Sequence, residues 1–400
     1  MPARRLVALL FAVSAVAVAL VGCASVGDPR GVVGRWQQDQ DSASFYEVGD
    51  VAPGEPGDLV RTQALDGPPV GARAWRVLYH STDQAGRDIV VSGLVIVPTA
   101  PAPAGGRAIV SWAHPTTGVA PVCAPSRTIG GTSLIPGLRG FIAAGDVIAA
   151  ADYPGLGVDN PSSYLIGAAE AHSVLDAARA ARNLVGAEAG PDLLLWGHSQ
   201  GGQAAIFAAQ EQRAYAPELR LQALAVAAPA SDLAALLRDH LDDVSGVTIG
   251  SYAYAAYASA YDLPLDAILT LEGIAKTPAM TKLCLLSQVG AIHRIAGPLV
   301  GDYTTADPGS TEPWAGFLAE NTPGGVRIGV PILVAQGLKD ALVDPAVTTA
   351  FVGRLCAAGE SVRYLQLPND THGVVALAAA GQVTAWMRDV RTGTPTTTSC

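Results

Sequence analysis

The chain has 400 residues, of which half are hydrophobic and only 15% are charged, and its formal net charge is −10. A chain of this length can bury a large core, as one domain with an insertion or as two domains. The acidic balance and the lack of any lysine- or arginine-rich run argue against a nucleic-acid partner, because binding phosphates needs a basic face.

The first 22 residues have the pattern of a secretory signal peptide. Arg4 and Arg5 precede an apolar run over residues 6–22, as export signals require. The run ends in LVGC, which is similar to a bacterial lipobox, so we expect Cys23 to carry lipid and residues 23–44 to be a polar tether. An ordinary signal peptide or a single membrane span is the alternative, although 17 residues is short for a span. We therefore predict an exported protein, lipid-anchored on the extracytoplasmic face of the cell membrane.

The next segments alternate between apolar strands and helices. Two strands over 73–80 and 89–98, joined by a polar turn, predict a β-hairpin. After them we expect strands and helices in this order: strands 107–115 and 146–155, a helix over 166–185, strand 192–197, a helix from Gly201, strands 221–230 and 330–337, a helix over 345–358, strand 361–368, and a helix over 374–390. This alternation predicts an α/β fold with a mostly parallel sheet and helices on both faces.

One long segment departs from the alternation. Residues 231–325 contain several expected short helices and no strand–helix repeat, and four tyrosines are closely spaced within 249–264. A tyrosine stripe is usually ordinary packing. Because the segment lies between two sheet strands, we expect a helical cap over the carboxyl edge of the sheet. The α/β core would then comprise residues 45–230 and 326–400.

The motif G-H-S-Q-G at residues 197–201 predicts a nucleophilic serine. An apolar strand precedes Ser199 and a helix rich in small residues follows it. That strand–turn–helix context is the one in which a G-x-S-x-G motif presents an exposed, strained serine. Serine needs a histidine base and a carboxylate that orients the histidine. In this kind of fold, both partners follow the serine along the chain.

The positions of the last strands predict which histidine is the base and which carboxylate is the acid. Of seven histidines, His372 is the one that follows the last strand, and His198 should point away from Ser199 within the turn. Asp340 directly follows strand 330–337 and is the predicted acid. The alternatives are Asp344, which we interpret as a helix N-cap, and Asp232 after the preceding strand. Asp370 stands too close to His372 in sequence to orient it.

An oxyanion hole requires backbone N–H groups aimed at the developing negative charge. The amide of Gln200, directly after the nucleophile, is one predicted donor. The loop after strand 107–115 should supply the other, from Thr116 with Thr117 close behind, and a threonine hydroxyl could add a side-chain donor. Pro115 stands where many hydrolases have glycine.

Four cysteines remain if Cys23 is lipidated: Cys123, Cys284, Cys356 and Cys400. An even number in an exported protein predicts two disulfides, and three pairings are possible. No C-x-x-C pair occurs, so the cysteines suggest neither a zinc site nor a redox motif.

Five motifs together resemble the secretory lipase family of the lipase-A type, within the α/β-hydrolase superfamily. They are GHSQGG (197–202), DYPGLG (152–157), TTGVAPVCAPS (116–126), GLKDALVDP (337–345) and THG (371–373). The resemblance covers nearly all of residues 45–400. It implies an α/β-hydrolase with an inserted helical cap, acting on carboxylic esters without a metal or cofactor. It also implies the disulfides Cys123–Cys284 and Cys356–Cys400, while the lipobox suggests a surface-anchored member.

The leading hypothesis is a serine lipase or esterase that acts on a small-molecule ester or lipid. An acyltransferase of the cell envelope would use the same acyl-enzyme, and a triad by itself does not distinguish ester from amide substrates. A non-catalytic surface lipoprotein that only binds ligands is the third hypothesis. That hypothesis would expect a missing triad member, whereas all three candidates are present.

Overall fold

The computed structural model describes residues 43–128 and 131–400. The predicted signal peptide 1–22, Cys23, and all but the last two residues of the predicted tether lie outside these ranges. Within the ranges described, no helix combines the length and the apolar character needed to cross a membrane.

A nine-stranded sheet forms the centre of the protein, in the order β1-β2-β3-β5-β4-β6-β7-β8-β9. Strands β1 to β3 are antiparallel to their neighbours, whereas β5, β4 and β6 to β9 run parallel. The strands are β1 (Leu59–Ala64), β2 (Ala72–Thr82), β3 (Asp88–Pro98), β4 (Arg107–Ala113), β5 (Val147–Ala151), β6 (Ala189–His198), β7 (Arg220–Ala227), β8 (Ile332–Gly337) and β9 (Val362–Leu367). The predicted β-hairpin is β2–β3, and edge strand β1 was not predicted.

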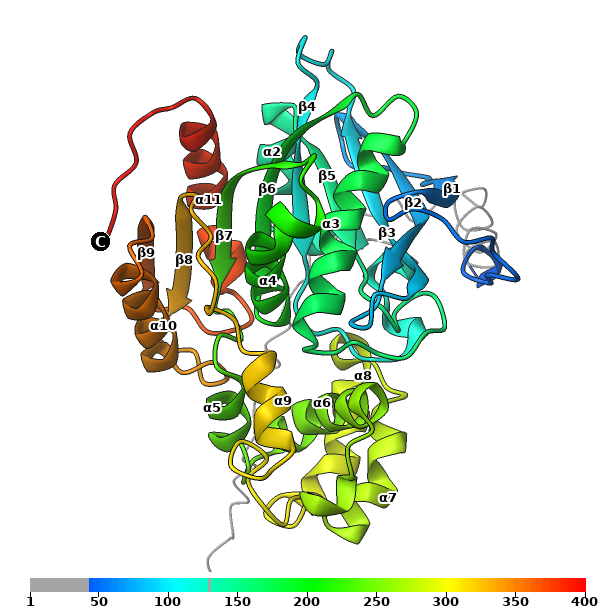
Figure 1. Ribbon diagram of the computed structural model, residues 1–400, viewed down its shortest axis with the longest axis vertical. Coiled ribbons are helices and arrows are strands. Elements are labelled where there is room, and N and C mark those ends of the chain that lie inside the picture. The colour runs from blue at the N-terminus through cyan, green and yellow to red at the C-terminus, as the bar shows by residue number, and fades with distance from the viewer. Residues whose placement is uncertain (1–42, 129–130) are drawn as a thin grey trace, which may run out of the picture. The chain divides into compact units, whose positions relative to one another are not determined.

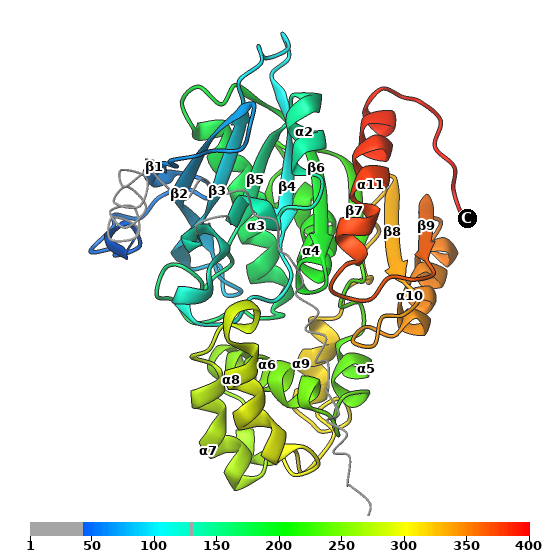
Figure 2. The ribbon, with the colours of Figure 1, turned by 180° about the vertical axis from the view of Figure 1, so that it is seen from behind.

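Helices cover both faces of this sheet (Figures 1 and 2). Helices α3, α4 and α10 lie on one face, and α2 and α11 lie on the other. Their bounds are α2 (Leu138–Ala144), α3 (Gly167–Asn183), α4 (Gln200–Tyr215), α10 (Pro345–Ala357) and α11 (Val375–Arg391). Every residue of β4, β5 and β8 is buried, as expected for parallel strands covered on both sides. The predicted α/β fold with a mostly parallel sheet is confirmed.

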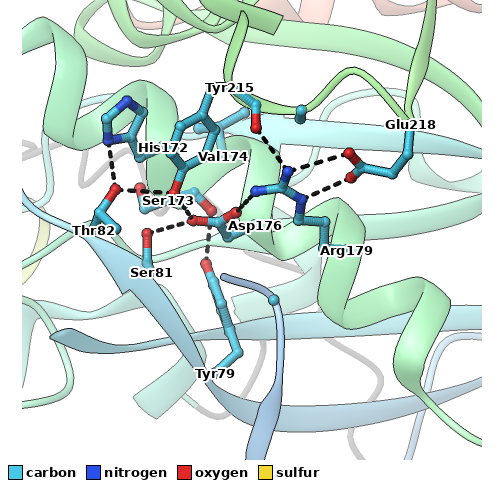
Figure 3. A network of polar contacts seen from close by, with 12 residues as sticks. Tyr79, Ser81, Thr82, His172, Ser173, Val174, Asp176, Arg179, Tyr215 and Glu218 are labelled. Atoms are coloured by element: carbon cyan, nitrogen blue, oxygen red, sulfur yellow. Dashed lines mark hydrogen bonds and ion pairs between the residues drawn. The ribbon is translucent and has the colours of Figure 1, made fainter. Parts of the chain in front are cut away.

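A buried polar network joins the first face to the sheet (Figure 3). Asp176 on α3 accepts hydrogen bonds from Ser81 of β2 at 2.8 Å, from Tyr215 of α4 at 2.7 Å and from Arg179 at 2.8 Å. Burial raises the pKa of this carboxyl, and the three donors act in the opposite direction. A buried carboxylate is costly unless it is hydrogen-bonded, so Asp176 fixes how α3 and α4 sit on β2.

The segment between β7 and β8 forms the helical insertion. Its helices are α5 (Leu233–Arg238), α6 (Val244–Tyr261), α7 (Leu271–Met280), α8 (Leu285–Ala296) and α9 (Trp314–Glu320). They lie beyond the carboxyl ends of the parallel strands (Figure 1). Tyr252, Tyr254 and Tyr257 of α6 are buried in an apolar core that the insertion shares with residues 164–166, which fits ordinary packing of the tyrosine stripe.

Short 3-10 helices complete the regular structure: η1 (Pro121–Cys123), η2 (Pro125–Arg127), η3 (Gly131–Leu134), η4 (Leu265–Ala267) and η5 (Gly297–Leu299). Two disulfides then link distant segments, Cys123–Cys284 and Cys356–Cys400. These are the pairs that the family resemblance implied. The first joins η1 to the start of α8 in the insertion, and the second ties the C-terminal residue to α10.

Candidate active site

Ser199 lies on a sharp turn between β6 and α4. Its backbone has φ 58° and ψ −118°, a strained conformation for a residue with a side chain. The N–H of Ser199 donates to the carbonyl of Ala227 at 3.0 Å, and its own carbonyl accepts from three N–H groups, those of Gly202, Gln203 and Ala230. The turn is therefore held by hydrogen bonds on both sides of the serine.

Two glycines make this turn possible because the backbone passes close to other backbone. A Cβ at position 197 would lie 2.1 Å from the carbonyl oxygen of Gly201, and a Cβ at 201 would lie 2.0 Å from that of Ala113. Neither distance can accommodate a side chain. The first and last residues of the G-H-S-Q-G motif are thus required by packing.

The three predicted residues of the triad lie together. Ser199 Oγ is 2.8 Å from His372 Nε2, and His372 Nδ1 is 2.8 Å from Asp340 Oδ2. The Asp340 side chain is fully buried and that of His372 is 17% exposed. The nucleophile, base and acid thus come from the ends of β6, β9 and β8, which meet at one edge of the sheet.

The surroundings of Asp340 favour the ionised form of its carboxyl group. Burial acts to raise the pKa of its carboxyl, but His372 and the N–H groups of Val343 and Leu342 outweigh burial, so the pKa lies below its usual value. Gln336 of β8 donates a further hydrogen bond to Oδ2 at 3.2 Å. This environment keeps a negative charge beside the histidine.

The alternative acids have other roles. Asp344 accepts a hydrogen bond from the N–H of Ala346 as the N-cap of α10, and Asp232 accepts from the N–H of Ala235 as the N-cap of α5. The carbonyl of Asp370 accepts from the N–H of Lys339. Among the four candidate acids, Asp340 is the one that accepts a hydrogen bond from His372 Nδ1 in the part of the chain described.

His198 has a position that sequence reasoning did not identify. Its Nε2–H donates to the backbone carbonyl of His372 at 3.0 Å, and the two imidazole rings lie 5.0 Å apart. Burial and the neighbouring His372 lower the pKa of His198 to about 3, so the ring is neutral near pH 7. The hydrogen bond from His198 thus links the end of β6 to the loop that carries His372.

The candidate oxyanion donors line the same cavity as Ser199. Gln200 is the first residue of α4, where an N–H has no partner within the helix. Among the residues described, no backbone carbonyl accepts from the N–H of Gln200, Thr116 or Thr117. The Thr116 hydroxyl is 2.8 Å from the Tyr164 hydroxyl, whereas the buried hydroxyl of Thr117 has no partner within the part of the chain described.

Glu170 is a second residue that the sequence did not single out. It is fully buried on α3, and its Oε1 accepts from the side-chain amide of Gln200 at 2.7 Å and from the N–H of Leu165 at 2.9 Å. Burial raises the pKa of Glu170 to about 8, although both donors lower it. Burial thus favours the protonated form of Glu170, whose Oε1 contacts the residue that follows Ser199.

A cavity of about 340 Å³ opens in front of Ser199 and His372. Most of its lining is apolar: Trp112, Leu134, Leu165, Leu236, Ile249, Leu285, Leu286, Leu342, Val343, Ala376 and Leu377. Leu134, Leu286 and Leu377 are also exposed to solvent, so apolar side chains extend from the cavity to the surface. No cluster of three or more potential metal ligands occurs in residues 43–128 and 131–400.

Comparison with known proteins places the chain in a family. The sequence profile described as "secretory lipase" matches residues 137–399. A Mycobacterium tuberculosis protein named as a probable inactive lipase is 25% identical over 343 aligned residues, and the match covers 82% of this chain and 76% of that protein.

Solved structures agree on the fold. Candida antarctica lipase A in its closed state superposes with a TM-score of 0.73 at 16% identity, covering 91% of this chain and 88% of that one. The rice cell wall degrading esterase LipA from Xanthomonas oryzae gives a TM-score of 0.70 at 21% identity, with coverages of 85% and 98%. With the family profile spanning more than half of its residues, the chain belongs to the secretory lipase family and has its α/β-hydrolase fold.

Proposed function

We propose that the protein is a serine hydrolase that cleaves carboxylic esters through Ser199, His372 and Asp340. The observation that carries the proposal is the pair of 2.8 Å contacts that join the three side chains in that order. Such an arrangement lets histidine take the serine proton while the carboxylate stabilises the imidazolium that forms.

The reaction would proceed in two halves. Ser199 Oγ attacks the ester carbonyl carbon and its proton passes to His372 Nε2, while the N–H groups of Gln200 and Thr116, with Thr117 nearby, bind the oxyanion. The C–O bond to the alcohol then breaks, and His372 protonates the departing alcohol. Water, deprotonated by His372, next attacks the acyl-enzyme, and the carboxylic acid leaves as Ser199 recovers its proton.

The cavity supports an apolar acyl group as the substrate part held near Ser199. Its lining is mostly aliphatic and its volume lies near the lower end of the range for small-molecule sites. A lipid or shorter acyl ester fits this chemistry. Transfer of the acyl group to another alcohol would use the same intermediate, with that alcohol in place of water.

Catalysis, rather than ligand binding alone, is the hypothesis that the site favours. The relative named as a probable inactive lipase raises the alternative of a non-catalytic member. Here, the nucleophile, base and acid are all present and within hydrogen-bond distance, which is the geometry that catalysis requires.

The test compares the wild-type protein with Ser199→Ala. We expect the variant to fold normally and to lose ester hydrolysis by about 10⁴- to 10⁶-fold, as for other triad nucleophiles. A fluorophosphonate probe should label Ser199 in the wild type, and peptide mass spectrometry would locate the label. Full turnover in the variant, or labelling elsewhere, contradicts the proposal.

We further propose that the protein is exported and held at the membrane by a lipid on Cys23. Family membership and the two disulfides are consistent with export, since disulfides persist in oxidising compartments. The anchor rests on the LVGC sequence at residues 20–23 alone.

A further inference from the structure

A second cavity, of about 330 Å³, adjoins the one in front of Ser199. The two cavities share Ile249, Leu285, Leu342, His372 and Gly373. Of the triad residues, His372 lines both, whereas Ser199 lines only the first. The catalytic imidazole therefore stands at the boundary between two spaces. We call them the acyl cavity, in front of Ser199, and the second cavity.

The two cavities differ in chemistry. The acyl cavity is mainly aliphatic and carries the candidate oxyanion donors. The second cavity is lined by the cationic side chain of Lys339, by His293, and by the hydroxyl residues Ser245, Thr248 and Thr371. None of its lining residues is Asp or Glu, although acidic residues outnumber Lys and Arg by 35 to 25 in the chain.

The backbone of Lys339 is fixed by a hydrogen bond, whereas its side chain has no ion-pair partner among the residues described. It directly precedes Asp340 in the loop after β8, and its N–H donates to the carbonyl of Asp370 at 3.0 Å. Its side chain is exposed and forms no ion pair with any residue that the structure describes. The chain contains only three lysines, and the other two, Lys276 and Lys282, do not line this cavity.

The proton transfer from His372 indicates which part of the substrate would occupy this cavity. In a triad hydrolase, the histidine gives its proton to the leaving alcohol. The alcohol must therefore lie on the His372 side of the scissile bond, while the carbonyl oxygen faces the donors beside Ser199. The second cavity is lined by His372 but not by Ser199, so it lies on the alcohol side of the scissile bond.

We infer that the second cavity binds the alcohol part of the substrate, and that Lys339 selects esters whose alcohol carries an anionic group such as a phosphate. This inference rests on the proposed ester hydrolysis. Lysine binds phosphates and carboxylates as a compact point charge. Ser245 and Thr371 add hydroxyl groups nearby, whereas the hydroxyl of Thr248 donates to the carbonyl of Val244. Because Lys339 is exposed, salt should weaken its attraction for the anion.

The experiment compares esters that share an acyl chain. The neutral probe is 1-octanoylglycerol, and the anionic probes are 1-octanoylglycerol 3-phosphate and the octanoyl ester of glyceric acid. Release of octanoate gives kcat/KM for each, and the readout is the ratio of anionic to neutral ester. An exposed ion pair contributes up to about 1 kcal/mol, so Lys339→Gln should lower the ratio by up to about fivefold.

Four further measurements make the result specific. The change should appear in KM rather than in kcat, because the anion is distant from the reacting bond. Lys339→Arg should retain most of the ratio, and added sodium chloride should lower the wild-type ratio. Lys276→Gln, an exposed lysine of α7 away from both cavities, is the matched control and should leave the ratio unchanged. A response with either anionic probe supports the inference, and the two probes tell phosphate from carboxylate.

The outcomes separate this inference from the proposed function. If the wild type hydrolyses the neutral ester and p-nitrophenyl octanoate but Lys339→Gln leaves both anionic ratios unchanged, the anionic-alcohol inference is wrong and ester hydrolysis stands. A folded wild-type protein that hydrolyses none of these esters would refute both.

Discussion

The environment of Asp340 leads to a sharp prediction for Asp340→Asn. Carboxylate Oδ1 accepts hydrogen bonds from the N–H groups of Leu342 and Val343, each at 2.9 Å. Oδ2 accepts from His372 Nδ1 at 2.8 Å and from Gln336 at 3.2 Å. An asparagine has only one acceptor oxygen, and the two backbone donors need it. Its NH₂ group must therefore face His372.

This orientation reverses the hydrogen bond to the base. With an NH₂ donor at Oδ2, His372 Nδ1 must accept, so the ring proton moves to Nε2, which faces Ser199. The imidazole can then no longer take the serine proton. A wrong tautomer of this kind lowers kcat by about 10⁴-fold in a serine protease, which corresponds to about 5 kcal/mol of activation free energy.

Gln336 cannot relieve the conflict by turning its amide. Its Oε1 accepts a hydrogen bond from Thr348 at 2.7 Å, which holds its Nε2 toward Oδ2. Two NH₂ groups would then face each other in a buried site. We expect an additional loss of about 1–3 kcal/mol of unfolding free energy, which is the cost of leaving buried donors unpaired.

The assay is hydrolysis of p-nitrophenyl octanoate, with thermal unfolding measured on the same samples. Asp344→Asn is the matched control, since asparagine caps a helix as well as aspartate does, and it should keep both activity and stability. Activity of Asp340→Asn within tenfold of the wild type would refute the argument. So would a much larger loss in Asp232→Asn, because it would place the acid after β7.

Two further predictions concern Glu170 and Cys23. Burial raises the folded-state pKa of Glu170 above its unfolded value, to about 8, so its contribution to stability is complete below about pH 4.5 and is lost as the pH rises toward 8. Glu170→Gln should remove this loss. The difference in unfolding free energy between the variant and the wild type should therefore shift in favour of the variant from pH 5 through pH 7 to pH 9, and a difference that does not change with pH would contradict this. Cys23→Ala should release the protein from membranes or block its processing, and mass spectrometry that finds an unmodified mature N-terminus on the wild type would rule out the lipid anchor.

Much of the fold could be predicted because the parallel strands are strongly apolar. β4, β5 and β8 are buried over their whole lengths, and such runs stand out in a sequence. Edge strand β1 does not stand out, since its sequence LVRTQA is half exposed and polar. β2 supplies the pairing that makes it a strand, and a partner 11 to 20 residues away leaves no local signal. The short helix α2 was missed for a similar reason, as it has only seven residues.

The order of the strands also predicted which serine, aspartate and histidine would meet. Each of the three follows a parallel strand, and the carboxyl ends of parallel strands share one edge of the sheet. Their partners could not be predicted in the same way. Glu170 lies in the middle of α3, where its sequence context resembles that of any helical carboxylate. Its contact with Gln200 arises only when α3 packs beside α4.

The same limit applies to the neighbours of the triad residues themselves. His198 precedes Ser199 and Lys339 precedes Asp340 in the sequence. In each turn, successive side chains diverge, so one member of the pair enters the triad and the other faces elsewhere. His198 packs beneath the loop of His372 and donates to its carbonyl, whereas Lys339 lines the second cavity. A motif identifies the reacting residue because its chemistry is specific. The role of the adjacent residue depends on which distant loop lies opposite it, and only the packed fold determines that.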